Sequence, residues 1–201
     1  MEIANPTRVV ARHANDPTER HWQAVLQIIQ YLLGTKNLSL TYERGPDFTL
    51  SVYTDANFAE KADDRRSVSG VVGSATVSWL SITQKIVTLS TTEAEYVALG
   101  DGVKEALFAK AVASFLVPGL TEKIILAIVD SEGAINLASN PLSSARTKHI
   151  DVRFHFVLEL VSSGTIVVEY VPTSEQRADI LTKPLTGSIF REHINFLMSL
   201  Y

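Results

Sequence analysis

The chain has 201 residues, of which 46% are hydrophobic, so it can form a core and is too apolar for a disordered protein. It contains no cysteine, which excludes a disulfide scaffold and a thiolate metal site. The formal net charge of −4 counts mildly against a nucleic-acid-binding protein. No apolar run approaches the length of a membrane span, and the N-terminal residues lack the apolar segment of a signal peptide. We therefore expect an intracellular protein, cytoplasmic or nuclear, that is not secreted and does not bind a membrane.

Residues 16–34 predict the first helix, with Asp16 as its N-cap and Pro17 at its first position. Its apolar residues recur at helical spacing: Trp22, Val25, Ile29 and Leu32. Because an isolated helix of this length is marginal in water, we expect this face to pack against the rest of the chain or against another chain. We place a domain boundary after this helix, with residues 1–47 as a helical appendage and residues 48–201 as the main domain.

The main domain begins with three short strands and continues with strands that alternate with helices. Strands are expected over residues 49–54, 69–72, 76–82, 124–129 and 165–171, and helices over residues 91–117, 132–139, 150–162 and 188–200. Thr173 and Gln176 have the spacing of a capping box and predict one more helix start. This order predicts a mixed α/β sheet, with an antiparallel meander followed by strands that helices connect.

Acidic residues follow two of the predicted strands. Asp55 comes at the end of the strand in "LSVYTDANF", and Asp130 ends the apolar run of "IILAIVDSEGA". Functional groups in such sheets gather at strand ends. A single Asp in this position often caps the next helix, and Asp130 could cap a helix that starts near Glu132. Asp55 is harder to explain in this way, because a hairpin follows it.

Further acids lie near the predicted starts of two helices. Glu93 and Glu95 occupy the first turn of the long helix, and Asp179 lies in the first turns of a later one. Compensation of the helix dipole is a sufficient explanation for each acid alone. It does not explain why the acids follow the strands and helices in this order.

Five stretches of the main domain resemble the ribonuclease H region of copia-type LTR retrotransposon polyproteins, in the same order. They are "VYTDANFAEKADDRRSVSG", "VSWLSITQKIVTLSTTEAEY", "VDSEGAINLASNP", "SSARTKHIDVRFHF" and "YVPTSEQRADILTKPL". The N-terminal "NDPTERHWQAVLQIIQYLLGTKNLSLTY" resembles the segment that joins the reverse transcriptase polymerase to that region. The resemblance covers almost the whole chain.

The resemblance implies a ribonuclease H-like fold, with a five-stranded mixed sheet of three antiparallel and then two parallel strands, flanked by helices. It implies an enzyme that hydrolyses the RNA strand of RNA/DNA hybrids with two Mg²⁺ or Mn²⁺ ions. Its catalytic and metal-binding acids would be Asp55, Glu95, Asp130 and Asp179, where Glu95 matches the acid of "AEY". Oxygen-only ligands suit these ions, and two carboxylates about 4 Å apart repel by roughly 4 kcal/mol at an effective dielectric near 20 unless a cation offsets them.

The partner that the resemblance implies is an RNA/DNA hybrid, recognised by its backbone and its 2′-hydroxyl groups. The residues expected to contact it are Asn57, Arg146, Lys148 and Arg153. The polymerase part of a reverse transcriptase is a second implied partner. The polymerase motif Tyr-x-Asp-Asp is itself absent, so we do not expect this chain to polymerise.

An alternative interpretation is a catalytically silent module, decayed or adapted by a host, that binds nucleic acid or a protein. The hairpin between "SG" at residues 69–70 and "SW" at residues 78–79 is shorter than the family pattern, and the "PTSEQR" stretch lacks the histidine that many ribonucleases H carry before the last acid. The presence of all four acids favours the enzyme. Integrases, which need a final Glu, and proofreading exonucleases, which need Asp-x-Glu on the first strand, fit less well.

Overall fold

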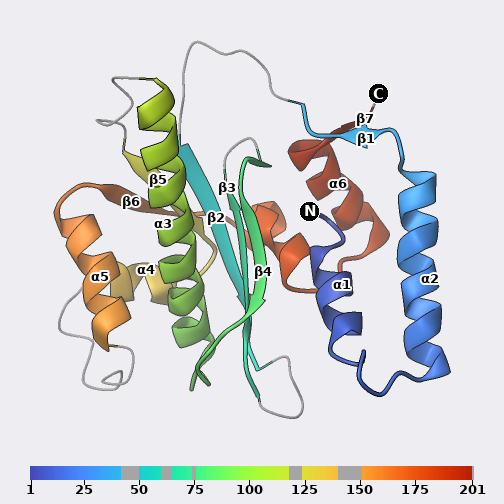
Figure 1. The fold of residues 1–201 in the computed structure, drawn as a ribbon. Coiled ribbons are helices and arrows are strands. Elements are labelled where there is room, and N and C mark those ends of the chain that lie inside the picture. The colour runs from blue at the N-terminus through green and yellow to red at the C-terminus, as the bar shows by residue number, and fades with distance from the viewer. Residues whose placement is uncertain (42–49, 60–64, 74–75, 118–123, 140–150, 201) are drawn as a thin grey trace.

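The computed structural model in Figure 1 contains a central sheet of five strands, in the order β4-β3-β2-β5-β6. It describes residues 1–41, 50–59, 65–73, 76–117, 124–139 and 151–200, with the backbone alone described for residues 151–154 and 199–200. The strands are β2 (Leu50–Asn57), β3 (Val68–Gly73), β4 (Trp79–Thr83), β5 (Ile125–Val129) and β6 (Ile166–Tyr170). Strands β2, β3 and β4 pair antiparallel, whereas β5 pairs parallel with both β2 and β6. The predicted mixed sheet of three antiparallel and two parallel strands is therefore confirmed.

Helices cover both faces of this sheet (Figure 1). One face carries α3 (Thr91–Leu116), α4 (Glu132–Ser139) and α5 (Asp151–Ser162), which surround the larger hydrophobic cluster. Helix α3 lies very close to β2, because a Cβ atom added at Gly102 would clash with the Thr54 side chain. The opposite face carries the 3₁₀ turns η5 (Thr173–Glu175) and η6 (Arg177–Leu181) and the helix α6 (Gly187–Leu197), around a second cluster.

The N-terminal residues form two helices, α1 (Ala4–Ala11) and α2 (Glu19–Gly34), and a short strand, β1 (Leu38–Ser39), that pairs with β7 (Ser199–Leu200). The sequence analysis missed α1, β1 and β7. Met1, Ala4 and Leu38 pack against the second cluster. The N-terminal part of the chain thus contacts the C-terminal part directly.

Helix α2 begins later than predicted. Its N-cap is Thr18 rather than Asp16, and the Thr18 backbone N–H donates to His21 Nδ1 at 3.1 Å. Asp16 and Pro17 precede the helix. His21, at the third helical position, thus accepts from the N–H of the N-cap residue, which is the role that Glu or Gln usually has in a capping box.

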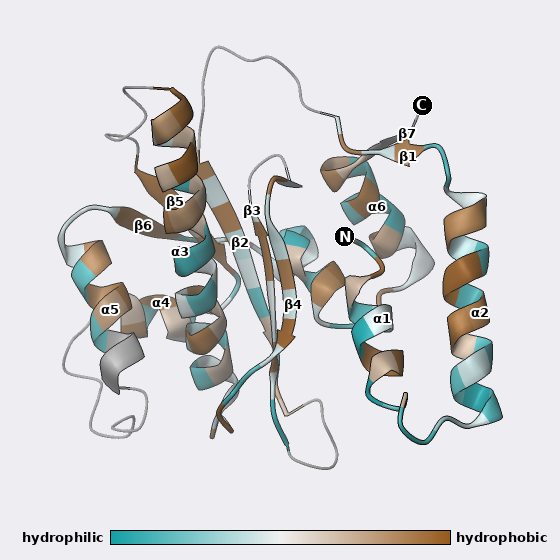
Figure 2. Cartoon of the chain, in the orientation of Figure 1, coloured by the Kyte–Doolittle hydropathy of each residue, from teal (hydrophilic) through white to brown (hydrophobic). Residues whose placement is uncertain are grey.

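The apolar face of α2 is visible as brown bands in Figure 2, and it stays partly open to solvent, with Trp22 54% exposed and Ile29 44% exposed. Its aromatic contact with the main domain is between Tyr31 and Phe190, whose ring centroids are 5.8 Å apart. A further partner for this face stays a prediction, as does the boundary after residue 47, which lies outside the described residues. No helix in the described ranges is both long and apolar enough to cross a bilayer.

Two features of the main domain bear on the sequence-based expectations. The short hairpin forms a regular ladder, in which Val72 pairs with Trp79 and the Gly73 N–H donates to Ser78 O at 2.8 Å. The capping box at Thr173 and Gln176 is wrong. The Gln176 amide donates to Thr54 O at 2.9 Å and its Oε1 accepts from the Ala178 N–H at 3.2 Å, so this side chain joins η6 to β2.

Candidate metal centre

Three of the four predicted acids converge at the sheet. Asp55 comes from β2, Asp130 follows β5 and Asp179 lies in η6, and one carboxylate oxygen of each lies within 4.8 Å of the others. The expectation that β2 ends at Asp55 is wrong, because the strand continues to Asn57 and Asp55 pairs with Gly70 of β3. The ladder on both sides of Asp55 fixes its backbone, which makes it a rigid ligand position.

The position of Asp179 depends on close packing of η6 over β3. A Cβ atom at Gly70 would lie 2.6 Å from Thr182 Cγ2 and 2.8 Å from Ala178 O, so η6 can lie this close to the sheet because residue 70 is glycine. The Ser81 hydroxyl of β4 donates to Leu181 O at 2.6 Å and holds the end of the turn. Asp179 is thus carried by a short turn that is anchored to β2, β3 and β4.

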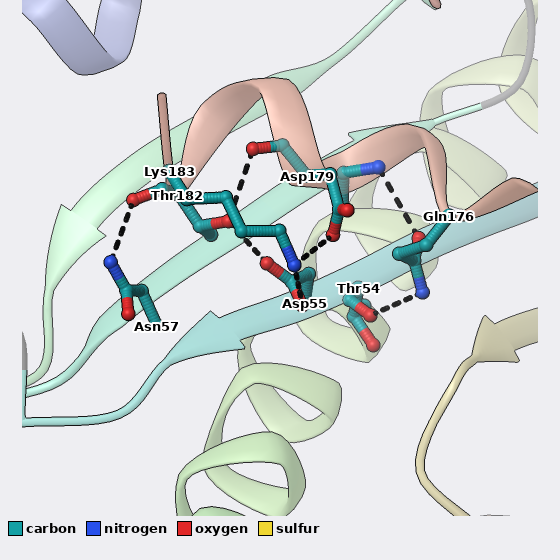
Figure 3. Close-up of polar contacts among 8 residues, drawn as sticks. Thr54, Asp55, Asn57, Gln176, Asp179, Thr182 and Lys183 are labelled. Atoms are coloured by element: carbon teal, nitrogen blue, oxygen red, sulfur yellow. Dashed lines mark hydrogen bonds and ion pairs between the residues drawn. The ribbon is translucent and has the colours of Figure 1, made fainter. Parts of the chain in front are cut away.

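Two residues directly after η6 contact the acids (Figure 3), and the sequence analysis did not identify either of them. The Thr182 hydroxyl donates to the Asp55 carboxylate and also lies 3.2 Å from Asp179 O. The Lys183 ammonium lies 2.8 Å from Asp179 Oδ1 and 3.9 Å from Asp55 Oδ1. The available signal was their spacing, since they follow Asp179 by three and four residues, which is about one helical turn.

Glu95, the fourth predicted acid, comes from the second turn of α3 and borders the cluster. Burial, followed by the charges of Asp55 and Asp130, raises its pKa to about 9. Its Oε2 atom is buried and has no hydrogen-bond partner among the described residues. Burial, followed by the charge of Asp55, also raises the pKa of Asp179 to about 7.

This arrangement fits divalent cations. The cluster supplies carboxylate oxygens only, which are the ligands that Mg²⁺ and Mn²⁺ prefer. The pKa of Asp55 is also raised, chiefly by burial, so the acids are held where their charged forms are disfavoured without a cation. The Glu95 Oε2 atom, which is buried and has no hydrogen-bond partner within the described part of the chain, is a candidate for a further ligand atom at the border of the cluster.

Neighbouring side chains account for two of the rival structural roles. Ser131 caps α4, because its Oγ accepts from the Ala134 N–H at 3.2 Å, so the alternative that Asp130 caps this helix is wrong. Glu93 is buried and accepts from the Leu89 N–H beside the Ser90 cap of α3, which gives it a structural role at the helix start. Glu93 therefore stabilises the start of α3, and Asp130, which does not cap α4, belongs to the acid cluster.

The predicted nucleic-acid contacts are described only in part. Asn57 is half-buried, and its Nδ2 donates to Thr182 O at 3.3 Å, so it ties the end of β2 to the residue that holds Asp55. Arg146 and Lys148 lie outside the described residues, as does the side chain of Arg153. Their role stays a prediction.

Known proteins resemble this chain in sequence and in fold. It is 41% identical over 192 residues to the retrovirus-related Pol polyprotein from transposon TNT 1-94 of Nicotiana tabacum. The aligned residues make up 94% of this chain and 14% of that polyprotein. The Pol polyprotein from transposon RE1 of Arabidopsis thaliana is 37% identical over 193 residues, which cover 94% of this chain and 13% of the polyprotein. The chain thus spans about one seventh of the length of these curated relatives. No protein-family model matches it.

The fold has a solved counterpart. The N-terminal ribonuclease H domain of a Mycobacterium tuberculosis protein, solved as a fusion with maltose-binding protein, superposes with a TM-score of 0.50 at 15% identity, over 75% of this chain and 99% of that one. At this identity the likeness concerns the fold alone. The chain therefore has a ribonuclease H-like fold and belongs to the Pol polyproteins of copia-type retrotransposons.

Proposed function

We propose that this chain is a metal-dependent endoribonuclease that hydrolyses the RNA strand of RNA/DNA hybrids with two divalent ions. The observation that carries the proposal is the convergence of Asp55, Asp130 and Asp179 within 4.8 Å, with Glu95 at their border. Membership of the retrotransposon Pol family and the ribonuclease H-like fold support the same activity. Mg²⁺ or Mn²⁺ is the expected cofactor.

Four acids would bind the ions, and neighbouring residues would orient these acids. Asp55, Asp130, Asp179 and Glu95 would hold the ions, which supply an activated water and a charge that stabilises the leaving oxygen of the phosphodiester. The β2–β3 ladder fixes the backbone of Asp55, and the hydrogen bond from Thr182 fixes the orientation of its carboxylate. Such fixed geometry matters, because a ligand displaced by about 1 Å can slow a reaction about 10²-fold.

The substrate would lie over the acid cluster, which is formed by residues of β2, of the segment after β5 and of η6. Recognition would depend on phosphates and 2′-hydroxyl groups rather than on base sequence. Arg146, Lys148 and Arg153 are the proposed phosphate contacts, and Asn57 would act mainly by holding Thr182. The polymerase part of a reverse transcriptase stays a proposed partner.

The test is incubation with an RNA/DNA hybrid labelled on each strand in turn, in Mg²⁺, Mn²⁺ or EDTA. We expect cleavage of the RNA strand in either metal, no cleavage in EDTA and no cleavage of single-stranded DNA. Asp55→Asn should abolish cleavage, whereas Glu159→Gln, at an exposed acid of α5, should not. Equal cleavage of both strands would indicate a general nuclease instead.

A second candidate is a silent module that binds nucleic acid without cutting it. The observation that favours it is the Lys183 ammonium, which already provides a cation for Asp179 and Asp55. The wild-type protein would then bind a fluorescent hybrid and leave it intact in every metal. Binding with cleavage excludes this candidate.

A further inference from the structure

Lys183 lies inside the candidate metal centre rather than beside it. Its ammonium contacts Asp179 Oδ1 at 2.8 Å and reaches to 3.9 Å from Asp55 Oδ1, so it is shared between two of the three converging acids (Figure 3). A divalent ion held by the same two carboxylates would need oxygen lone pairs that now face the ammonium, since Mg²⁺ binds oxygen at about 2.0–2.1 Å. The lysine and the ion therefore exclude each other from Asp179 Oδ1.

The lysine side chain has room to leave. It is 34% exposed, and it also lines a cavity of about 550 Å³ between η6, α6 and the N-terminal helices, with Glu2, Tyr31 and Phe190 among the other lining residues. The ammonium contacts these two acids, so an ion that replaces it there need not disrupt a packed core.

We propose that Lys183 is a built-in counter-cation, which stabilises the metal-free centre and competes with divalent ions for Asp179 and Asp55. The inference rests on the proposed function in one respect, that these acids bind metal. It adds that the affinity of the centre for metal is set by the exchange of an ammonium for an ion. Lys183 is thus a positioning and regulating residue and not a ligand.

This competition predicts opposite changes in two quantities when the ammonium is removed, namely the stability of the metal-free protein and its affinity for metal. Removal of the ammonium leaves the acids with less compensation, so the metal-free protein should become less stable. The same change removes the competitor, so metal should bind more tightly. A lysine that merely packs at the end of η6 would lower stability without raising metal affinity, and one that merely contacts substrate would change neither quantity.

The experiment uses the full chain and two charge-changing variants. Lys183→Met removes the ammonium and keeps most of the side-chain length, and Lys36→Met removes an equal charge from the exposed turn after α2. Melting in EDTA and calorimetric titration with Mn²⁺ and with Mg²⁺ give stability and affinity without substrate. For Lys183→Met we expect a melting temperature about 2–4 °C lower in EDTA and a Kd for Mn²⁺ at least about tenfold lower, or about 1.4 kcal/mol. Lys36→Met should match wild type in both.

Two further variants close the test. Lys183→Arg keeps a cation and should bind Mn²⁺ with nearly wild-type affinity, and Lys183→Gln carries the same prediction as Lys183→Met if the methionine variant does not fold. If wild-type protein binds Mn²⁺ and neither neutral variant binds it more tightly, the inference is overturned and the proposed function stands. If neither the wild-type protein nor any variant binds metal, both the inference and the proposed function are overturned. If a neutral variant binds Mn²⁺ and the wild-type protein does not, the inference is supported.

Discussion

Gly70 lies directly opposite Asp55 in the β2–β3 ladder, and the turn that carries Asp179 covers it. The space above Gly70 is so small that a methyl group would come within 2.8 Å of Ala178 O and 2.6 Å of Thr182 Cγ2. One glycine therefore sets the distance between two acids that are 124 residues apart in sequence, from Asp55 to Asp179.

Gly70→Ala is expected to lift η6 from the sheet and to weaken the metal centre. Overpacking of this kind typically lowers the free energy of unfolding by about 1–3 kcal/mol. Melting in EDTA and Mn²⁺ titration should both show a loss. Gly73→Ala on the same strand is the control, because its added Cβ would meet Ser78 O at an ordinary 3.5 Å. Equal Mn²⁺ affinity in the Gly70 variant and wild type would mean that η6 does not set the ligand geometry.

Much of the fold could be predicted from local patterns, because burial of alternate or helically spaced residues constrains each element by itself. Helix α3 begins at the predicted Thr91, and β5 follows the predicted apolar run to within one residue. Strands β1 and β7, of two residues each, carry no such pattern, since their pairing joins the two ends of the chain. Helix α1 is short and was also missed.

The acids of the candidate site could be predicted from the sequence, whereas the residues that hold these acids in position could not. Thr182 reaches Asp55 across 127 residues and Gln176 reaches Thr54 across 122, and these side-chain contacts leave no trace in a local sequence window. Gln176 was misinterpreted because its spacing from Thr173 fits a capping box. The long-range contact with β2 prevails, because a buried amide needs hydrogen-bond partners.

The stability of the metal-free protein should fall as pH rises. The folded-state pKa of Glu95 is about 9 against an ordinary 4.5, and that of Asp179 is about 7 against 3.8. Between these values the folded state binds more protons than the unfolded state, so the free energy of unfolding decreases with pH. The decrease should extend from about pH 4 to about pH 7 for Asp179 and to about pH 9 for Glu95.

Melting temperatures in EDTA from pH 5 to pH 9 provide the measurement. Glu95→Gln should flatten the upper part of the curve, because the amide cannot ionise, whereas Glu132→Gln at an exposed position of α4 should leave the curve unchanged. Saturating Mg²⁺ should also reduce the slope, since metal binding favours the ionised acids. A metal-free curve that rises with pH would show that these acids are not buried together.

Residues 1–41 are expected to stabilise the main domain. Met1, Ala4 and Leu38 pack on the cluster that includes Ile194, and β1 pairs with β7. A chain of residues 48–201 should therefore melt lower, by about 4–8 °C for a loss of about 2 kcal/mol of apolar burial. Leu33→Ala in the full chain is the control, since that side chain is 70% exposed and its loss should stay within about 0.5 kcal/mol. An unchanged melting temperature of the shorter chain would support two independent units with a boundary after residue 47.

Asp130→Asn separates the metal-site role of Asp130 from a structural one. The change keeps the shape of the side chain and removes a charge that raises the pKa values of Asp55, Glu95 and Asp179. Metal-free stability should therefore hold or rise, because repulsion among the acids decreases. Cleavage of a hybrid in Mg²⁺ should fall by about 10²-fold or more, because the loss of a ligand disturbs the geometry on which the reaction depends.

The matched control is the next residue, Ser131, whose hydroxyl caps α4. Ser131→Ala should lower the free energy of unfolding by about 1 kcal/mol and leave cleavage near the wild-type rate. The two neighbours should thus show opposite patterns, with activity lost and stability kept at Asp130, and stability lost and activity kept at Ser131. If Asp130→Asn cleaves the hybrid as fast as wild type, Asp130 holds no catalytic ion. The centre would then have to be built from Asp55, Asp179 and Glu95, with Asp130 contributing only its charge and no ligand atom.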